Sequence, residues 1–211
     1  MKRKISEKLL EWRGRTRRHP LILRGARQVG KTFLVRELAK SFAHYLEVNF
    51  EEEESVAELF RSKDPRVICE LLEAKYDIPL VDGESLLFLD ELQDAEPYVL
   101  ESLRYFYEKR PGLHVIAAGS LLEFLLDAEA RKNKQASFSM PVGRIEYMFV
   151  APMDFEEFLL AVGKKGLYKW FPRRGGCVAH EPRSALRTVR RTASSLCRRR
   201  IRGTDSLLLG A

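Results

Sequence analysis

The sequence predicts an α/β domain with three layers, in which helices cover both faces of a mostly parallel β-sheet. Two observations lead to this fold class. Short apolar runs alternate along the chain with segments whose apolar residues recur at helical spacing. Polar residues of chemical interest follow directly after several of these runs, as in open parallel sheets that bind ligands beyond the carboxyl ends of their strands. With 211 residues and 45% hydrophobic content, the chain can bury one substantial core.

Five short segments have the pattern of strands. They cover residues 21–23, 45–50, 86–89, 114–120 and 147–150. The first and third are wholly apolar, which is typical of strands that are buried on both faces. The second alternates, with Leu46, Val48 and Phe50 on one face, and this predicts a strand with one buried face.

Four segments have helical periodicity, at residues 31–41, 64–76, 97–107 and 154–162. Pro97 suits a first helical turn, where its missing N–H costs nothing. Asp154 and Glu157 are spaced like a capping box, which predicts that the last helix opens at Asp154. The buried stripes that we expect on the second and fourth helices are Val67, Ile68, Leu71 and Leu72, and Phe155, Phe158, Leu159 and Val162.

A phosphate-binding loop is predicted at the first strand-to-helix junction, where the chain matches G-x-x-x-x-G-K-[ST] in full. Its residues are Gly25, Ala26, Arg27, Gln28, Val29, Gly30, Lys31 and Thr32. Glycines let backbone N–H groups face phosphates, and the following helix adds its positive end. We expect Lys31 to reach the β- and γ-phosphates and Thr32 to ligate Mg²⁺. The motif therefore predicts that ATP and Mg²⁺ bind here, against the plain alternative of a glycine turn before a helix.

An acidic pair, Asp90 and Glu91, follows the apolar run at 86–89 and has the form of a Walker B segment. We expect Asp90 to hold Mg²⁺, and Glu91 to orient or deprotonate the attacking water. A solvated acidic strand end is the alternative, but the upstream phosphate loop favours the catalytic interpretation.

Further polar residues are weaker candidates for the same site. Ser120, at the end of the fourth strand, is expected to contact the γ-phosphate or the water, or else to cap the next helix. Arg144 is a candidate γ-phosphate sensor or arginine finger, with a solvated arginine as the alternative. Arg27 could serve a neighbouring subunit or a local carboxylate, and Gln93 could report on the phosphate state.

The composition of the chain also bears on where in the cell the protein is located. No apolar run is long enough to span a bilayer, and no secretion signal follows the basic N-terminus. The three cysteines, Cys69, Cys177 and Cys197, have no metal-ligand spacing and form no disulfide framework. We therefore expect a cytoplasmic protein that makes no use of a membrane.

Basic charge is concentrated in the tail. Residues 168–211 carry ten Arg, one Lys, one Glu and one Asp, a net charge of +9, which leaves −2 for residues 1–167 out of the total of +7. Nucleic-acid binding by charge would therefore depend on the tail alone.

Four segments, in this order, carry a family resemblance: PLILRGARQVGKTFLVRELA, LLFLDELQD, HVIAAGSLLEFLL and PVGRIEYMFVAPMDFEEFL. They resemble the prokaryotic AAA-type ATPases of the AAA_14 family, whose members usually carry a C-terminal domain of unknown function, DUF4143. The resemblance covers about residues 20–162 and implies an AAA+ core, ATP as the nucleotide, and hydrolysis. The family's motif roles fall on Gly25, Gly30, Lys31, Thr32, Asp90, Glu91 and Ser120, and Arg144 lies in its characteristic Gly-Arg step.

This resemblance divides the chain into a helical lead-in at 1–19, an AAA+-type ATPase domain at 20–167, and an Arg-rich tail at 168–211. The tail departs from the family. We favour a frame-shifted translation of the second domain, then a disordered basic arm that binds nucleic acid, and then a short helical subdomain. Under the first two interpretations the tail is not a packed domain.

Two functions are expected from these residues. The first is an ATPase that couples hydrolysis to the movement of a partner domain or macromolecule, and the second is a nucleotide-dependent switch with negligible turnover. A phosphotransferase ranks last because no acceptor site is evident, and the absence of an N-K-x-D segment argues against GTP. A homo-oligomer, with arginine supplied by a neighbour, is what the resemblance allows, and the protein or nucleic-acid partner is not identified.

Overall fold

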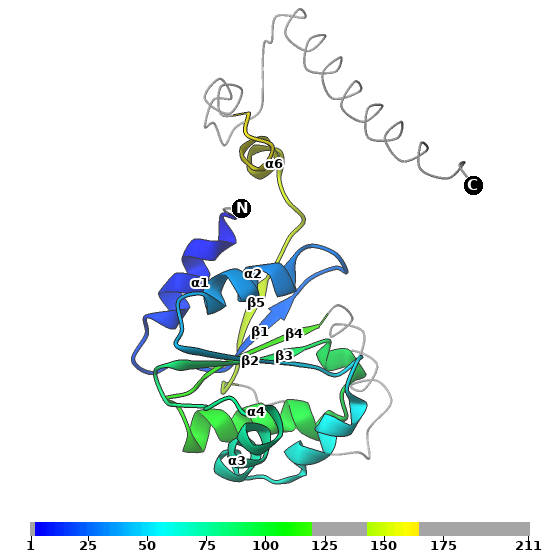
Figure 1. The fold of residues 1–211 in the computed structure, drawn as a ribbon. Coiled ribbons are helices and arrows are strands. Elements are labelled where there is room, and N and C mark those ends of the chain that lie inside the picture. The colour runs from blue at the N-terminus through cyan, green and yellow to red at the C-terminus, as the bar shows by residue number, and fades with distance from the viewer. Residues whose placement is uncertain (1–2, 120–142, 165–211) are drawn as a thin grey trace, which may run out of the picture. The chain divides into compact units, whose positions relative to one another are not determined.

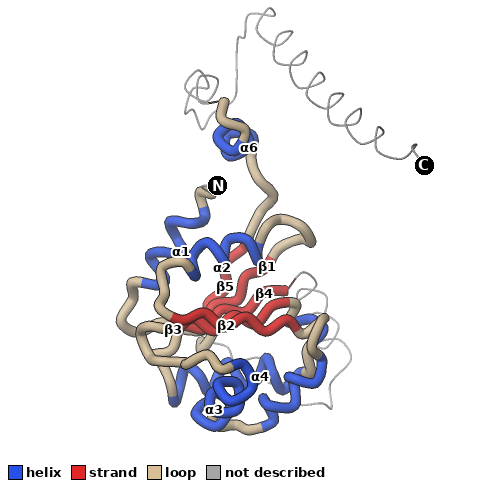
Figure 2. Tube along the Cα trace, in the orientation of Figure 1, coloured by secondary structure: helices blue, strands red, loops and turns tan. Residues whose placement is uncertain are grey.

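The computed structural model describes residues 3–119 and 143–164 of the chain. Five parallel strands form one sheet in the order β2-β3-β4-β1-β5 (Figures 1 and 2). Their bounds are β1 Leu21–Arg24, β2 His44–Asn49, β3 Ser85–Asp90, β4 His114–Gly119 and β5 Glu146–Phe149. All five predicted strands are confirmed to within one residue at each end, and so is the α/β fold class with a parallel sheet.

Helices cover both faces of this sheet. Their bounds are α1 Ile5–Arg13, α2 Lys31–Ala39, α3 Pro65–Tyr76, α4 Pro97–Lys109 and α6 Phe155–Ala161, with 3-10 turns η1 Glu54–Arg61 and η2 Leu92–Asp94. In Figure 1, α1 and α2 lie on one side of the sheet, and α3 and α4 lie on the other. The three predicted layers are therefore present.

The central strands alternate between two cores, which explains why they are continuously apolar. Leu87 of β3 packs into the core beneath α3 and α4, whereas its neighbours Leu86 and Phe88 pack into the core beneath α1 and α2. In β1, likewise, Ile22 faces the first core and Leu23 the second. Because side chains alternate along a strand and both faces are covered, all of β3 and the first three positions of β1 are buried.

The N-terminal segment packs into the same domain. Leu9 and Trp12 of α1 are buried in the core that contains α2, with Trp12 0% exposed. The described residues, 3–119 and 143–164, belong to one compact unit. The domain boundary expected at residues 19–20 stays a prediction. The tail predicted at 168–211 lies outside the described residues.

Two expected helix stripes differ from the structure. On α3 the buried positions are Pro65, Ile68, Cys69 and Leu72, whereas Val67 and Leu71 are exposed. The helix therefore presents the face with Cys69, and not the face with Val67 and Leu71, to the core that it shares with α4 and η1. On α6, only one of the expected stripe residues, Leu159, is buried. Phe155, Phe158 and Val162 are each close to half exposed, since nothing among the described residues covers that face.

Candidate nucleotide-binding site

The phosphate loop joins β1 to α2 at the carboxyl edge of the sheet. Gly30 is the N-cap of α2 with φ +89°, so this helix begins with no side chain over its first N–H groups. Gly25 has φ +151°, and a Cβ placed there would lie 2.3 Å from the carbonyl oxygen of Val150. Gln28 adopts φ 62° between the two glycines. Both glycines therefore hold backbone conformations that the loop needs, and the backbone curls at the positive end of a helix.

Lys31 is buried and reaches back over its own loop. Its Nζ donates to the carbonyl oxygens of Gly25, at 3.0 Å, and Ala26, at 2.9 Å. Burial lowers the pKa of Lys31, and the negative charges of Glu91 and Asp90 oppose that shift. The ammonium group is thus held in the loop by dipoles and by nearby carboxylates, where a phosphate oxygen would be a stronger partner.

Thr32 and Asp90 meet across the site, although 58 residues separate them in the chain. The Thr32 hydroxyl donates to Asp90 Oδ2 at 2.7 Å. Burial raises the pKa of Asp90, while the Thr32 hydroxyl and the Glu91 amide lower it. Hydroxyl and carboxylate oxygens are the hard donors that Mg²⁺ prefers, so this pair fits a magnesium ion.

Glu91 stands at the end of β3 in a left-handed conformation, with φ 49° and ψ 47°. Its Oε2 accepts a hydrogen bond from Gln93 Nε2 at 2.6 Å, and the same amide group donates to Asp94 at 2.6 Å. A non-glycine residue in this region costs about 1–2 kcal/mol, and such conformations concentrate at functional sites. Gln93, which was expected to sense the phosphate state, therefore contacts the candidate catalytic carboxylate directly.

These residues enclose a cavity of about 310 Å³. It is lined by Arg27, Gln28, Gly30, Lys31, Thr32 and Glu91. Its volume lies at the lower end of the roughly 300–1,000 Å³ of small-molecule sites. The cavity is large enough for a polyphosphate group, and its lining combines cations, backbone amides and a carboxylate.

One expected site residue, Arg144, lies away from this cluster, and a second, Ser120, is not tested by the described structure. Arg144 precedes β5 and therefore lies at the amino edge of the sheet, opposite the phosphate loop. There its Nε lies 2.5 Å from Glu108 Oε1, in an ion pair at the end of α4. Ser120 lies outside the described residues, although β4, which ends at Gly119, lies between β1 and β3.

One contact to the loop was not expected from the sequence. Arg3 Nη1 donates to the carbonyl oxygen of Val29 at 3.0 Å, and its Nη2 donates to that of Ala151 at 2.8 Å. The guanidinium also lies against the carboxylate of Glu157. Val29 and Ala151 lie 26 and 148 residues from Arg3 in the chain. Because Arg3 binds their backbone carbonyls, which every residue has, no side chain at these positions indicates the contact in the sequence.

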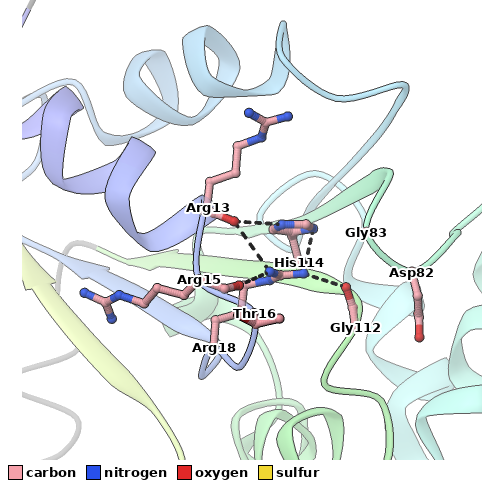
Figure 3. A pocket seen from close by; sticks show the side chains of 9 residues that line it. Arg13, Arg15, Thr16, Arg18, Asp82, Gly83, Gly112 and His114 are labelled. Atoms are coloured by element: carbon pink, nitrogen blue, oxygen red, sulfur yellow. Dashed lines mark hydrogen bonds between the residues drawn. The ribbon is translucent and has the colours of Figure 1, made fainter.

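A second cavity, of about 560 Å³, lies at the amino edge near Arg18 and His114 (Figure 3). Arg18 Nη1 donates to the carbonyl of Arg15 at 2.5 Å, and Nη2 donates to that of Gly112 at 2.8 Å. The guanidinium groups of Arg13 and Arg15 point away from this centre in Figure 3. Arg18 therefore fastens the turn after α1 to the loop before β4, which is a structural role.

A glycine loop, a buried lysine and a threonine–aspartate pair at the carboxyl edge of a parallel sheet define a P-loop nucleotide-binding protein. The family model for the AAA domain, AAA_14, matches residues 17–159, and the chain belongs to this family. No curated protein matches the chain significantly in sequence. Among the described residues, no helix combines the length and apolar character that crossing a membrane requires.

Three solved structures are among those that match the chain. A Walker-type ATPase of Pyrococcus abyssi is 20% identical, with a TM-score of 0.49, over 80% of this chain and 58% of that one. Cdc6p from Pyrobaculum aerophilum is 14% identical, with a TM-score of 0.44, over 83% and 52%. PCH-2 of C. elegans is 12% identical, with a TM-score of 0.36, over 78% and 43%. The chain thus spans about half the length of these structures.

Proposed function

We propose that this chain binds Mg-ATP at residues 25–32 and hydrolyses it to ADP and phosphate, and that hydrolysis drives a conformational change. The observation that carries the proposal is the 2.7 Å hydrogen bond between Thr32 and Asp90. It brings the two oxygen donors for Mg²⁺ together beside Glu91, whose carboxylate lines the same cavity as Lys31. Family membership supports nucleotide binding in general.

Each residue has a role in this proposal. Thr32 and Asp90 would hold Mg²⁺, which supplies positive charge to the transferred phosphoryl group when bound. Lys31 would exchange its carbonyl partners for phosphate oxygens, and the amides of the loop would bind the remaining oxygens. Glu91 would accept a proton from the attacking water, or orient it.

A nucleotide-dependent switch with negligible turnover is the second candidate, and one observation favours it. Gln93 Nε2 already donates to Glu91 Oε2 at 2.6 Å, so part of the carboxylate that hydrolysis needs is occupied. Under this alternative, Gln93 keeps Glu91 from the water, and ATP occupancy alone sets the conformation.

Steady-state phosphate release from the full chain, measured beside ATP affinity, separates the two functions. We expect Lys31→Ala to lose ATP binding, and Glu91→Gln to bind ATP but release phosphate about 100-fold more slowly. Gln93→Ala isolates the amide contact, since a switch held by Gln93 should gain turnover in this variant. If the unmodified chain binds ATP yet releases phosphate no faster than Glu91→Gln, it is not an ATPase.

Arg144 can contribute to ATP hydrolysis only if copies of this chain assemble into an oligomer. Because it lies at the edge opposite its own phosphate loop, it could reach the nucleotide of a neighbouring copy but not its own. We propose such a homo-oligomer as the setting for hydrolysis. Arg144→Ala should then lower phosphate release while ATP affinity stays unchanged, and mixing it with Lys31→Ala chains should restore part of the activity.

Nucleic-acid binding by the basic tail also stays a prediction.

A further inference from the structure

Arg3 is a buried cation behind the phosphate loop, with only 4% of its surface exposed. Its Nη1 lies 3.0 Å from the carbonyl oxygen of Val29, and a Cβ on Gly30 would lie 3.7 Å from the same nitrogen. Its Nη2 binds the carbonyl of Ala151 at 2.8 Å. The guanidinium therefore touches the loop at the two residues that precede Lys31.

A second buried group holds Arg3 from the other side. The Nε of Arg3 lies 3.2 Å from Oε1 of Glu157, which is 5% exposed. That carboxylate also accepts the amides of Lys4, at 2.7 Å, and Asp154, at 3.0 Å. Although burial raises the pKa of Glu157, these amides and the Arg3 guanidinium bring it below its ordinary value. Glu157 is thus ionised at neutral pH, and the two charges compensate each other in a buried place.

The Val29 carbonyl matters because it shares a peptide plane with the Gly30 amide. In a trans peptide the C=O and N–H groups point in opposite directions. Gly30 lines the nucleotide cavity. Because the Val29 oxygen points to Arg3, the Gly30 N–H of the same peptide points away from Arg3, where it is available to an anion.

We infer that Arg3 is a positioning residue for the nucleotide site, which fixes the Val29–Gly30 peptide in the orientation that binds phosphate and is itself held by Glu157. The inference rests on the proposed function, because it concerns affinity for Mg-ATP. Glu157 lies in the first turn of α6, so the same contact ties the phosphate loop to that helix.

The test measures the affinity of the full chain for Mg-ATP, its melting temperature, and amide hydrogen exchange over residues 25–32. Arg3→Met should weaken Mg-ATP binding about tenfold and speed exchange in the loop. Arg3→Lys should recover part of the affinity, because an ammonium keeps the charge but lacks the planar fork that reaches three partners. Glu157→Gln should weaken binding about threefold, since it leaves Arg3 in place with a poorer partner.

Two controls separate positioning from general loss of stability. Lys4→Met removes surface ion pairs to Asp154 and Glu156 in the same segment. These partners of the Lys4 side chain lie outside the phosphate loop, so the ATP affinity of this variant should stay within twofold of the parent. Arg18→Met removes another buried arginine that binds carbonyls, at the opposite edge of the sheet. It should lower the melting temperature without changing ATP affinity or loop exchange.

Each result of this experiment either supports or overturns the inference about Arg3. Unchanged affinity in Arg3→Met, or an equal loss in Arg18→Met, overturns the inference while the proposed function stands. If Arg3→Met does not fold, Arg3→Lys and Glu157→Gln decide in its place, and parent-like affinity in both overturns the inference. If the unmodified chain fails to bind Mg-ATP, the proposed function and this inference are overturned together.

Discussion

Gly25 shows how a motif residue is constrained by more than its motif. Its φ of +151° is a conformation that side chains rarely adopt, and its Cα faces the carbonyl of Val150 so closely that a Cβ would lie 2.3 Å from the oxygen. The first constraint belongs to the loop itself. The second arises only because β5 lies next to β1 in the sheet.

Gly25→Ala should therefore cost about 2–4 kcal/mol of unfolding free energy, because backbone strain and overpacking add. Gly143→Ala is the matched control, since Gly143 also has positive φ, +76°, but a Cβ there meets no atom of the described residues within 4 Å. It should cost about 1–2 kcal/mol. Urea denaturation of both variants measures the difference, and equal losses would show that the contact with Val150 is immaterial.

Asp90 shows a conflict between stability and chemistry at a single residue. Burial raises the pKa of its carboxyl in the folded protein. At pH values above the unfolded pKa of about 3.9, keeping this carboxyl ionised therefore lowers the free energy of unfolding. Asp90→Asn keeps an acceptor for the Thr32 hydroxyl and removes the buried charge.

We expect Asp90→Asn to match or exceed the parent in unfolding free energy at neutral pH, although a typical substitution loses about 1 kcal/mol. The same variant should lose the dependence of ATP binding on Mg²⁺. Chemical denaturation and nucleotide titrations with and without Mg²⁺ check the two expectations, and a destabilised variant would argue that the Asp90 charge contributes to folding.

At the scale of an element, α3 and α4 begin with the same device but different caps. Each has proline in its first turn, Pro65 and Pro97. At α3 the N-cap Asp64 accepts the amide of Arg66 at 3.1 Å, whereas at α4 the N-cap Glu96 makes no side-chain capping bond. Aspartate is short enough to reach back to the first turn, which favours it as an N-cap.

Asp64→Ala should cost about 1 kcal/mol of unfolding free energy, and Glu96→Ala should cost nearly nothing. Thermal or urea unfolding of the two single variants tests this difference. Similar losses from both would mean that charge at the start of the helix, and not the capping bond, is responsible.

The helix α6 shows where element-level prediction succeeds and where it ends. The capping box between Asp154 and Glu157 is present as predicted, with Glu157 N donating to Asp154 Oδ1 at 2.8 Å. Three of the four apolar residues expected to be buried are exposed, and the buried positions are Leu159 and the charged Glu157. A capping signal is local and survives any packing, whereas which face is buried depends on what lies beside the helix.

At the scale of the whole molecule, His114 links three distant segments. Arg18 can only donate, so the contact of its Nη2 with His114 Nδ1, at 3.4 Å, makes Nδ1 an acceptor and leaves the proton on Nε2 for the Arg13 carbonyl, also 3.4 Å away. Burial lowers the pKa of His114 to about 4, and the charge of Arg18 adds to this effect. The rings of Trp12 and Phe42 each make a T-shaped contact with the imidazole.

This histidine should make stability depend on pH. Between pH 4 and the unfolded pKa of about 6.5, the unfolded chain binds a proton that the folded protein excludes, so unfolding free energy falls as pH falls through this window. From about pH 7.5 to about pH 5 the loss should be about 2 kcal/mol. His114→Gln should remove most of this dependence in urea titrations, and an unchanged pH slope would assign it to other groups.

The sequence by itself determined the parallel α/β fold and all five strands, and it located the G-x-x-x-x-G-K-T motif at a strand-to-helix junction. These features are local: apolar runs, helical spacing, and glycines that recur at fixed intervals. The acidic pair at 90–91 was also visible, because it directly follows a strand.

Only the tertiary structure decided which of these residues meet. Strand order brings Asp90 within 2.7 Å of Thr32, and strand direction sends Arg144 to the far edge, where it pairs with Glu108. The tertiary structure also places Arg3 behind the phosphate loop. No sequence pattern predicts this contact, because the partners of Arg3 there are backbone carbonyls. The physical reason is the same in each case. Pairing between segments distant in the chain depends on how the sheet is ordered and packed, and that order is a property of the whole fold.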